Sequence, residues 1–172
     1  MREVENVEEV AEALAGMRRI GVDGTDGVGK STLSKRLGEM IGVPVFALDD
    51  FLEKEQGGFV EHIKYDELRA SLADEGRLLI EGVCLREVLS RAAISVDAFV
   101  YVKRYHLDVW SDECELDIDE PLEQFIKRER DLCSRLVGEK LKSFGLGEEI
   151  IRYHFQYRPF RDAHVIYRWN DT

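Results

Sequence analysis

The alternation of apolar runs with helical segments predicts an α/β fold, in which a mostly parallel five-stranded sheet lies between layers of helices. Five short runs rich in aliphatic and aromatic residues have the composition of buried parallel strands. They are residues 18–23, 43–48, 77–80, 97–102 and 164–168. Segments with helical apolar spacing alternate with them, at residues 31–41, 65–75, 84–92, 121–138 and 147–157. A glycine-rich turn joins the first strand to the first of these helices, which supports the same fold class.

The composition predicts one globular domain over residues 1–172. The chain is 44% hydrophobic and 34% charged, and no apolar run approaches the roughly 20 residues of a membrane span. The first residues are polar and acidic, unlike a signal or transit peptide, and the three cysteines form no C-x-x-C pair. These features are typical of a cytoplasmic protein, and they leave a homo-oligomer open.

The net charge of −11 disfavours a polyanionic partner such as DNA or RNA. A small phosphorylated ligand needs only a local basic pocket, so the charge does not exclude one. The four histidines share no metal-ligand spacing and are interpreted as surface or core residues.

The first element expected is an amphipathic helix. Val4, Val7, Val10 and Leu14 recur on one helical face, and Gly16 is suited to end the helix. We expect this helix to pack or cap the domain rather than to carry chemistry.

The glycine-rich turn after the strand at 18–23 satisfies the pattern G-x-x-x-x-G-K-[ST], the phosphate-binding loop. Glycine lets the backbone approach a phosphate without a Cβ in the way, and successive N–H groups form an anion nest. Lys30 adds a positive charge for the outer phosphates, and the Ser31 hydroxyl can bind Mg²⁺. The predicted nucleotide-binding residues are Gly24, Thr25, Asp26, Gly27, Val28, Gly29, Lys30, Ser31 and Thr32.

Carboxylates follow the next two predicted strands. Asp49 and Asp50 come after the strand at 43–48, and Glu81 comes after the strand at 77–80. Ligands of parallel sheets bind beyond the carboxyl ends of the strands, so these side chains can hold Mg²⁺ or accept a proton from a substrate hydroxyl. The aspartate pair could instead cap a helix, and Glu81 could be an exposed strand end.

The helix predicted from Pro121 is rich in arginine, including Arg128, Arg130 and Arg135. Guanidinium groups stabilise charge on a transferring phosphoryl group, although a helical charge run is also typical of a solvated face. Before this helix, residues 108–120 are expected to form an acidic loop, and residues 53–64 a mobile connection. A cluster near the C-terminus could stack on a purine, but its spacing favours core packing; its members are Tyr153, Phe155, Tyr157 and Phe160.

Three segments together resemble the uridine kinase and phosphoribulokinase-like family of P-loop kinases. They are residues 22–32, Leu48-Asp-Asp-Phe51 and Ile80-Glu-Gly82. Residues 96–102 are similar to the family's next strand, and Arg128-Glu-Arg-Asp131 is similar to its lid helix. The resemblance spans roughly residues 18–135.

The resemblance implies a P-loop NTPase three-layer α/β/α sandwich with a helical lid over roughly residues 121–145. It implies ATP as the phosphoryl donor, Asp49 as the general base, and Ser31, Asp49 and Glu81 around Mg²⁺. Lys30, Arg128 and Arg130 would act on the phosphates. The acceptor would be a small alcohol, first of all a nucleoside such as uridine.

The chain also departs from the family. The stretch from Asp50 to Leu78 is short and has no obvious counterpart of the hairpin that grips a nucleoside base, and the acidic residues 105–120 are an addition. Pantothenate, ribosyl nicotinamide or a sugar therefore stays open as the acceptor.

Three other functions compete with a small-molecule kinase. A GTPase-type switch is disfavoured because the chain has no Asn-Lys-x-Asp sequence. A nucleotide-binding regulator without transfer activity is disfavoured by the presence of Asp49 and Glu81. A kinase acting on a macromolecule would have little surface for docking in a chain of this length.

Overall fold

The computed structural model describes residues 1–53 and 58–170, and part of the connection expected at 53–64 therefore lies outside the described residues. The strands are β1 (Arg2–Val4), β2 (Arg19–Gly24), β3 (Val45–Ala47), β4 (Leu78–Gly82), β5 (Ala98–His106), β6 (Val109–Trp110) and β7 (Val165–Asn170). The helices are α1 (Val7–Ala13), α2 (Lys30–Ile41), α3 (Tyr65–Leu72), α4 (Leu85–Ala92), α5 (Glu113–Leu116), α6 (Leu122–Val137) and α7 (Leu146–Tyr157). Two 3-10 turns, η1 (Leu48–Phe51) and η2 (Val60–His62), lie between β3 and α3.

The sheet has the strand order β1-β7-β5-β2-β4-β3, and β6 pairs with β5. Each pair along this path is parallel, whereas β6 is antiparallel to β5. The α/β class is therefore confirmed, and all five predicted strands are present. The strand number was underestimated, because β1 and β6 make it a seven-stranded sheet.

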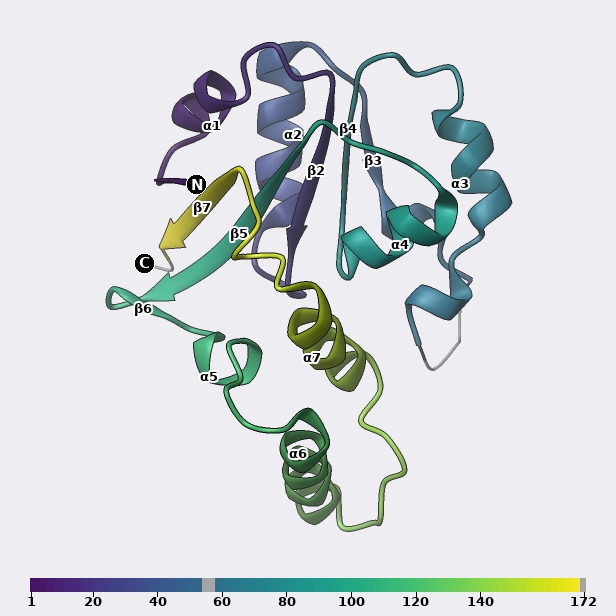
Figure 1. The fold of residues 1–172 in the computed structure, drawn as a ribbon, viewed down its shortest axis with the longest axis vertical. Helices are drawn as coiled ribbons and strands as arrows, with labels where there is room; N and C mark the ends of the chain where they lie inside the picture. The colour runs from purple at the N-terminus through teal and green to yellow at the C-terminus, as the bar shows by residue number, and fades with distance from the viewer. Residues whose placement is uncertain (54–57, 171–172) are drawn as a thin grey trace.

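Helices cover both faces of the sheet (Figure 1). Successive residues of a strand point to opposite faces, and β4 shows this directly: Leu78 and Ile80 belong to the core cluster under α3, α4 and α7, while Leu79 belongs to the cluster under α1 and α2. All three side chains are fully buried. The strand is therefore apolar on both faces, as its sequence predicted.

The N-terminal helix is shorter than expected, because Val4 belongs to a strand. β1 pairs with β7, with Val4 opposite Tyr167, and Val4 is buried there. Asn6 then begins the helix, since its side chain accepts a hydrogen bond from the backbone N–H of Glu9 at 2.9 Å. Val4 satisfies helical spacing, but it forms a strand because its backbone pairs with the edge of β7.

The acidic segment 108–120 is also more ordered than the expected loop. It forms β6 and α5, and it buries Trp110, Leu116 and Ile118. Asp117 accepts hydrogen bonds from Arg158 at 3.0 Å and Arg161 at 2.5 Å, which fixes the segment to the end of α7. Asp117, together with Asp112 and Glu120, therefore has specific partners, while Glu113, Glu115 and Asp119 are exposed.

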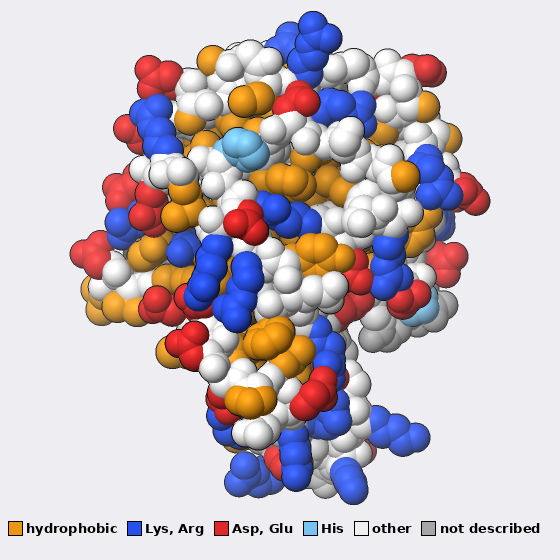
Figure 2. Space-filling view, viewed as in Figure 1, with side chains coloured by type: hydrophobic (Ala, Val, Ile, Leu, Met, Phe, Trp, Pro, Cys, Tyr) orange, Lys and Arg blue, Asp and Glu red, His pale blue; other side chains and the backbone are white. Residues whose placement is uncertain are grey.

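α6 extends away from the sheet and forms the narrow lower part of the molecule in Figure 1. Its Phe125 and Ile126 pack against Ile151 of α7 in a small separate cluster with Ile118. Figure 2 shows many Lys and Arg side chains on this part of the molecule. Among the described residues, no helix is long and apolar enough to cross a membrane.

Candidate active site

The loop between β2 and α2 has the geometry of an anion-binding nest. Gly27 and Gly29 have φ of +69° and +89°, a region that favours glycine. α2 begins at Lys30, and among the described residues no side chain caps its first turn. The free N–H groups of that turn therefore point toward the loop, where they can bind a phosphate.

Lys30 is buried in this loop. Its Nζ donates a hydrogen bond to the backbone carbonyl oxygen of Thr25 at 2.7 Å, and only 7% of the residue is exposed. Burial lowers the pKa of Lys30, while the nearby carboxylates of Glu81 and Asp23 act in the opposite direction. A cation that bonds to a loop carbonyl can turn to a stronger anionic partner when one enters the loop.

The carboxyl ends of β3 and β4 bring the predicted carboxylates to the same place. Ser31 donates a hydrogen bond from its Oγ to Oε1 of Glu81 at 2.7 Å. Burial raises the pKa of Glu81, and the bond from Ser31 and the charge of Lys30 oppose that rise. Asp49 lies in the first turn after β3 and faces the same cavity. The expectation that strand ends gather these side chains agrees with this arrangement.

This cavity has a volume of about 590 Å³ and two kinds of lining residue. The glycine loop contributes residues that the sequence predicts to bind phosphate, and other segments contribute an apolar lining. The apolar lining residues are Leu52, Phe59, Val83 and Leu146. Trp169 of β7 closes the loop side, and a Cβ on Gly29 would come within 3.2 Å of its ring. The cavity therefore combines polar and charged groups with an apolar lining.

The oxygen atoms of the site fit Mg²⁺ held together with a phosphorylated ligand. Within residues 1–53 and 58–170, no group of three or more His, Cys, Asp or Glu side chains could hold a metal by itself. Mg²⁺ prefers oxygen ligands and usually binds one or two carboxylates together with water and substrate phosphates. Ser31, Asp49 and Glu81 provide such a partial set.

Asp23 is a buried carboxylate beside the glycine loop that the sequence analysis did not single out. It lies at the end of β2, and its Oδ1 accepts a hydrogen bond from the Gly24 backbone N–H at 2.8 Å. Its Oδ2 accepts one from the Tyr153 hydroxyl of α7. Burial raises the pKa of Asp23 to about 6, although both hydrogen bonds oppose the rise. The signal was present, because Asp23 ends an apolar strand just as Glu81 does.

The predicted core packing of Tyr153 is confirmed, since it is 1% exposed. His154 beside it is a core residue too. Its Nδ1 lies 2.7 Å from the Ile150 carbonyl oxygen and its Nε2 lies 2.8 Å from the Tyr101 hydroxyl, so Nδ1 donates and Nε2 accepts. Burial lowers the pKa of His154 to about 4, which keeps the ring neutral.

The arginines of α6 lie apart from this cavity. Arg128 pairs with Glu120 at 2.7 Å, and Arg130 pairs with Glu148 of α7 at 2.8 Å. Of the described residues that line the cavity at the loop, none comes from α6. Arg130 and Arg135 instead line a separate open cavity beside α6.

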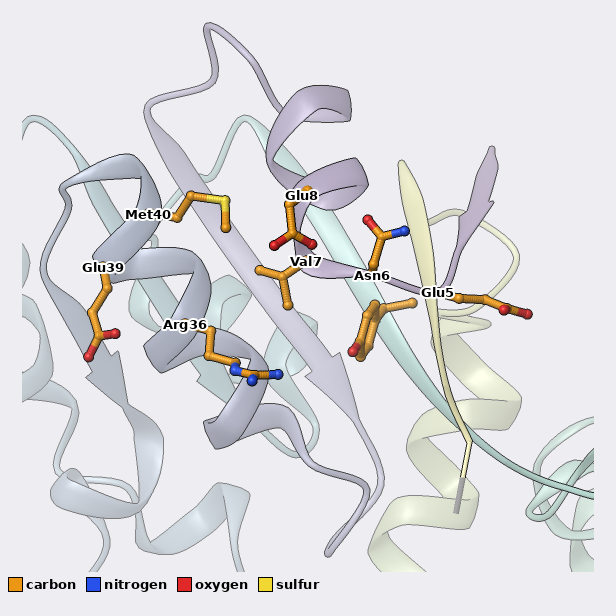
Figure 3. Close-up of a pocket in the computed structure, with 8 residues that line it drawn as sticks. Glu5, Asn6, Val7, Glu8, Arg36, Glu39 and Met40 are labelled. Carbon is orange, nitrogen blue, oxygen red and sulfur yellow. The ribbon is translucent and has the colours of Figure 1, made fainter. Parts of the chain in front are cut away.

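A further cavity of about 560 Å³ lies between α1, α2 and β7 (Figure 3). Its charged lining residues are Glu5, Glu8, Arg36 and Glu39. Three carboxylates against one guanidinium repel an anion, and the cavity does not include the glycine loop. The charges of this cavity therefore do not favour a phosphate, unlike those of the cavity at the loop, which Lys30 lines.

No protein-family model and no curated protein matches this sequence. Several solved structures are similar to this chain in fold. A possible uridine kinase from Bacillus stearothermophilus matches with a TM-score of 0.54 and 16% identity, over 94% of this chain and 96% of that one. A shikimate kinase from Acinetobacter baumannii in complex with shikimate matches with a TM-score of 0.45 and 18% identity, over 94% and 89% of the two chains.

A gluconokinase from Sinorhizobium meliloti 1021 matches with a TM-score of 0.44 and 15% identity, over 89% of this chain and 82% of that one. At these identities the likeness concerns the fold alone, and of the three structures the first has a TM-score above 0.5. The chain shares the α/β fold of that possible uridine kinase, and its glycine loop follows β2 as predicted. The predicted resemblance is confirmed at the level of the fold.

Proposed function

We propose that this chain is a single-domain, ATP- and Mg²⁺-dependent phosphotransferase that moves the γ-phosphoryl group of ATP to the hydroxyl of a small molecule. One observation carries the proposal: Lys30, Ser31, Asp49 and Glu81, from three separate segments, line one cavity. A nucleoside such as uridine is the first acceptor to test. Pantothenate, ribosyl nicotinamide and sugars are the alternatives.

The donor half would be the glycine loop. The N–H groups at the start of α2 and the Lys30 ammonium would neutralise the phosphates, and Ser31 with Glu81 and Asp49 would hold Mg²⁺. The bound ion would draw charge from the phosphate oxygens. Thr25 of the loop donates a hydrogen bond to Asp112 at 2.9 Å, which helps to fix the loop in place.

The acceptor half would place a hydroxyl beside Asp49. The hydroxyl oxygen forms a bond to the γ-phosphorus, the bond from that phosphorus to the bridging oxygen of ADP breaks, and the hydroxyl proton passes to Asp49. Leu52, Phe59 and Leu146 would exclude water from this half, which limits hydrolysis of ATP.

We also propose that the region of about residues 121–145 is the lid, with Arg128 and Arg130 as its phosphate-directed cations. Both arginines are held by carboxylates in the structure, so reaching a phosphate requires these pairs to exchange. Loop and domain closures of this kind are common in phosphoryl-transfer enzymes.

The test is an ADP-release assay with ATP and Mg²⁺ over uridine, pantothenate, ribosyl nicotinamide and glucose. Lys30→Ala should remove most of the activity, because the charge for the outer phosphates is lost. Asp49→Asn should abolish transfer and leave ATP binding within about twofold, since an amide accepts no proton.

Full turnover by the Asp49→Asn protein would refute its assignment as the base. ATP binding without release of ADP for any of these alcohols would instead indicate a nucleotide-binding protein that lacks transfer activity. Preference for GTP over ATP in a binding titration would favour the GTPase-type alternative.

A further inference from the structure

The turn that carries Phe59 is fastened to α7 by one carboxylate. Oε2 of Glu149 accepts a hydrogen bond from the Phe59 backbone N–H at 2.7 Å, and Oε1 accepts one from the Val60 N–H at 2.8 Å. Hydrogen bonds to an ionised acceptor are about twice as strong as neutral ones. Both carboxylate oxygens are therefore used to hold a single turn, 90 residues away along the chain.

This turn needs such support, because it has little regular structure of its own. η2 is only three residues long, from Val60 to His62, and a single 3-10 turn is weakly stable. Among the described residues, the N–H groups of Phe59 and Val60 have no recorded acceptor other than Glu149. Other bonds also hold this turn, since the Tyr65 hydroxyl donates to the Val60 carbonyl oxygen at 2.8 Å and the Glu53 N–H donates to the His62 carbonyl oxygen at 2.9 Å. Glu149 supplies the acceptors for the two N–H groups at its start, and so contributes to the position of Phe59.

Phe59 forms part of the apolar lining of the cavity that the glycine loop also lines. Its side chain is 3% exposed and belongs to the main core cluster. A shift of the turn would move this wall of the acceptor half and leave the glycine loop in place, because the loop is held by other contacts, those of Asp23 and Asp112.

The helix that carries Glu149 also contacts α6. The neighbouring Glu148 pairs with Arg130 at 2.8 Å, and Arg152 pairs with Glu123 at 2.6 Å. α7 thus joins α6 to the acceptor wall, and Leu146 at its start lines the cavity itself. Glu149 connects this helix to the turn that carries Phe59.

We propose that Glu149 is a positioning residue for the acceptor: it holds the Phe59 turn and so sets the affinity for the alcohol, without touching the reacting atoms. The inference rests on the proposed transfer activity. It assigns a role in substrate selection to a residue outside the motifs that identify the nucleotide site.

The test is Glu149→Gln, which preserves the size of the side chain. A glutamine has one oxygen that can accept, and its NH₂ group would face the second N–H as a donor against a donor. The KM for the alcohol should rise about tenfold, as expected for one lost charge-assisted bond. The KM for ATP, and kcat at saturating alcohol, should stay within about twofold.

Glu61→Gln is the matched control. Glu61 lies in the same turn but points outward, where it pairs with Arg91 at 2.5 Å and its side chain is 71% exposed. This variant should leave both KM values unchanged. Urea unfolding of the two variants shows whether they are folded under the assay conditions.

The assay uses whichever of uridine, pantothenate, ribosyl nicotinamide or glucose the wild-type protein phosphorylates. An unchanged alcohol KM in Glu149→Gln, or a parallel rise of both KM values, would overturn the inference while wild-type turnover leaves the proposed function intact. If the wild-type protein phosphorylates none of the four, the proposed function fails, and this inference with it.

Discussion

The buried carboxyl of Asp23 should make the free energy of unfolding depend on pH, and Asp23→Asn should remove this contribution. The pKa of Asp23 is raised from its ordinary value of 3.8 to about 6, chiefly by burial. A carboxyl whose pKa is raised by folding favours the folded state while it is protonated. The stability that it contributes is therefore present below about pH 4 and is lost as the pH rises through 6.

The size of this loss follows from the pKa values. Raising a carboxyl pKa from 3.8 to about 6 corresponds to about 3 kcal/mol in the free energy of unfolding between pH 3 and pH 7. Asp23→Asn keeps the shape and carries no charge, so it should avoid the loss. The free energy of unfolding of the variant, relative to that of the wild type, should therefore rise by about 3 kcal/mol from pH 3 to pH 7.

The assay is urea unfolding of both proteins at intervals from pH 3 to pH 7. The many other carboxyls titrate in both proteins, so the difference between the two curves isolates Asp23. Tyr153→Phe, which removes one hydrogen bond that favours the ionised form, should move the same loss to higher pH. A wild-type-minus-variant difference that stays constant from pH 4 to pH 7 would refute the reasoning.

Two further substitutions test the frame around the site. Gly82→Ala should destabilise the protein by about 1–3 kcal/mol in urea unfolding, because the new Cβ would lie 2.7 Å from the buried Leu48 side chain. It should also lower kcat, since Leu48 precedes Asp49. An unchanged stability would mean that the Leu48 side chain can move to make room at no cost. Ser31→Ala should raise the Mg²⁺ concentration needed for half-maximal ADP release by about tenfold, since Glu81 loses its partner; an unchanged Mg²⁺ dependence would remove Ser31 from the metal site.

Much of this site could be predicted because its signals are local. The glycine loop specifies its own backbone, and Asp49 and Glu81 end apolar strands that a parallel sheet brings to one edge. The core of α2, β2 and β4 follows from apolar spacing for the same reason. Each of these features needs only a few neighbouring residues to be recognised.

The remaining parts depend on distant partners. Val4 fits helical spacing, and only the edge of β7 decides that it forms a strand. Trp169 reaches Gly29 from the other end of the chain, and Glu149 binds a turn 90 residues before it. Nothing in the residues next to these positions indicates the partner, so tertiary pairing determines their roles.

The pairing of β1 with β7 constrains how this chain can assemble. Among the described residues, Val4 and its neighbours pair with Val165–Tyr167 of β7, which lies beside the N-terminus in Figure 1. This edge of the sheet therefore stays open until residues 165–167 have been made. An open edge can pair with another molecule, and contacts between distant segments form slowly. We expect chains cut before β7 to aggregate through the exposed edge of β5, even though the complete glycine loop is already present in them.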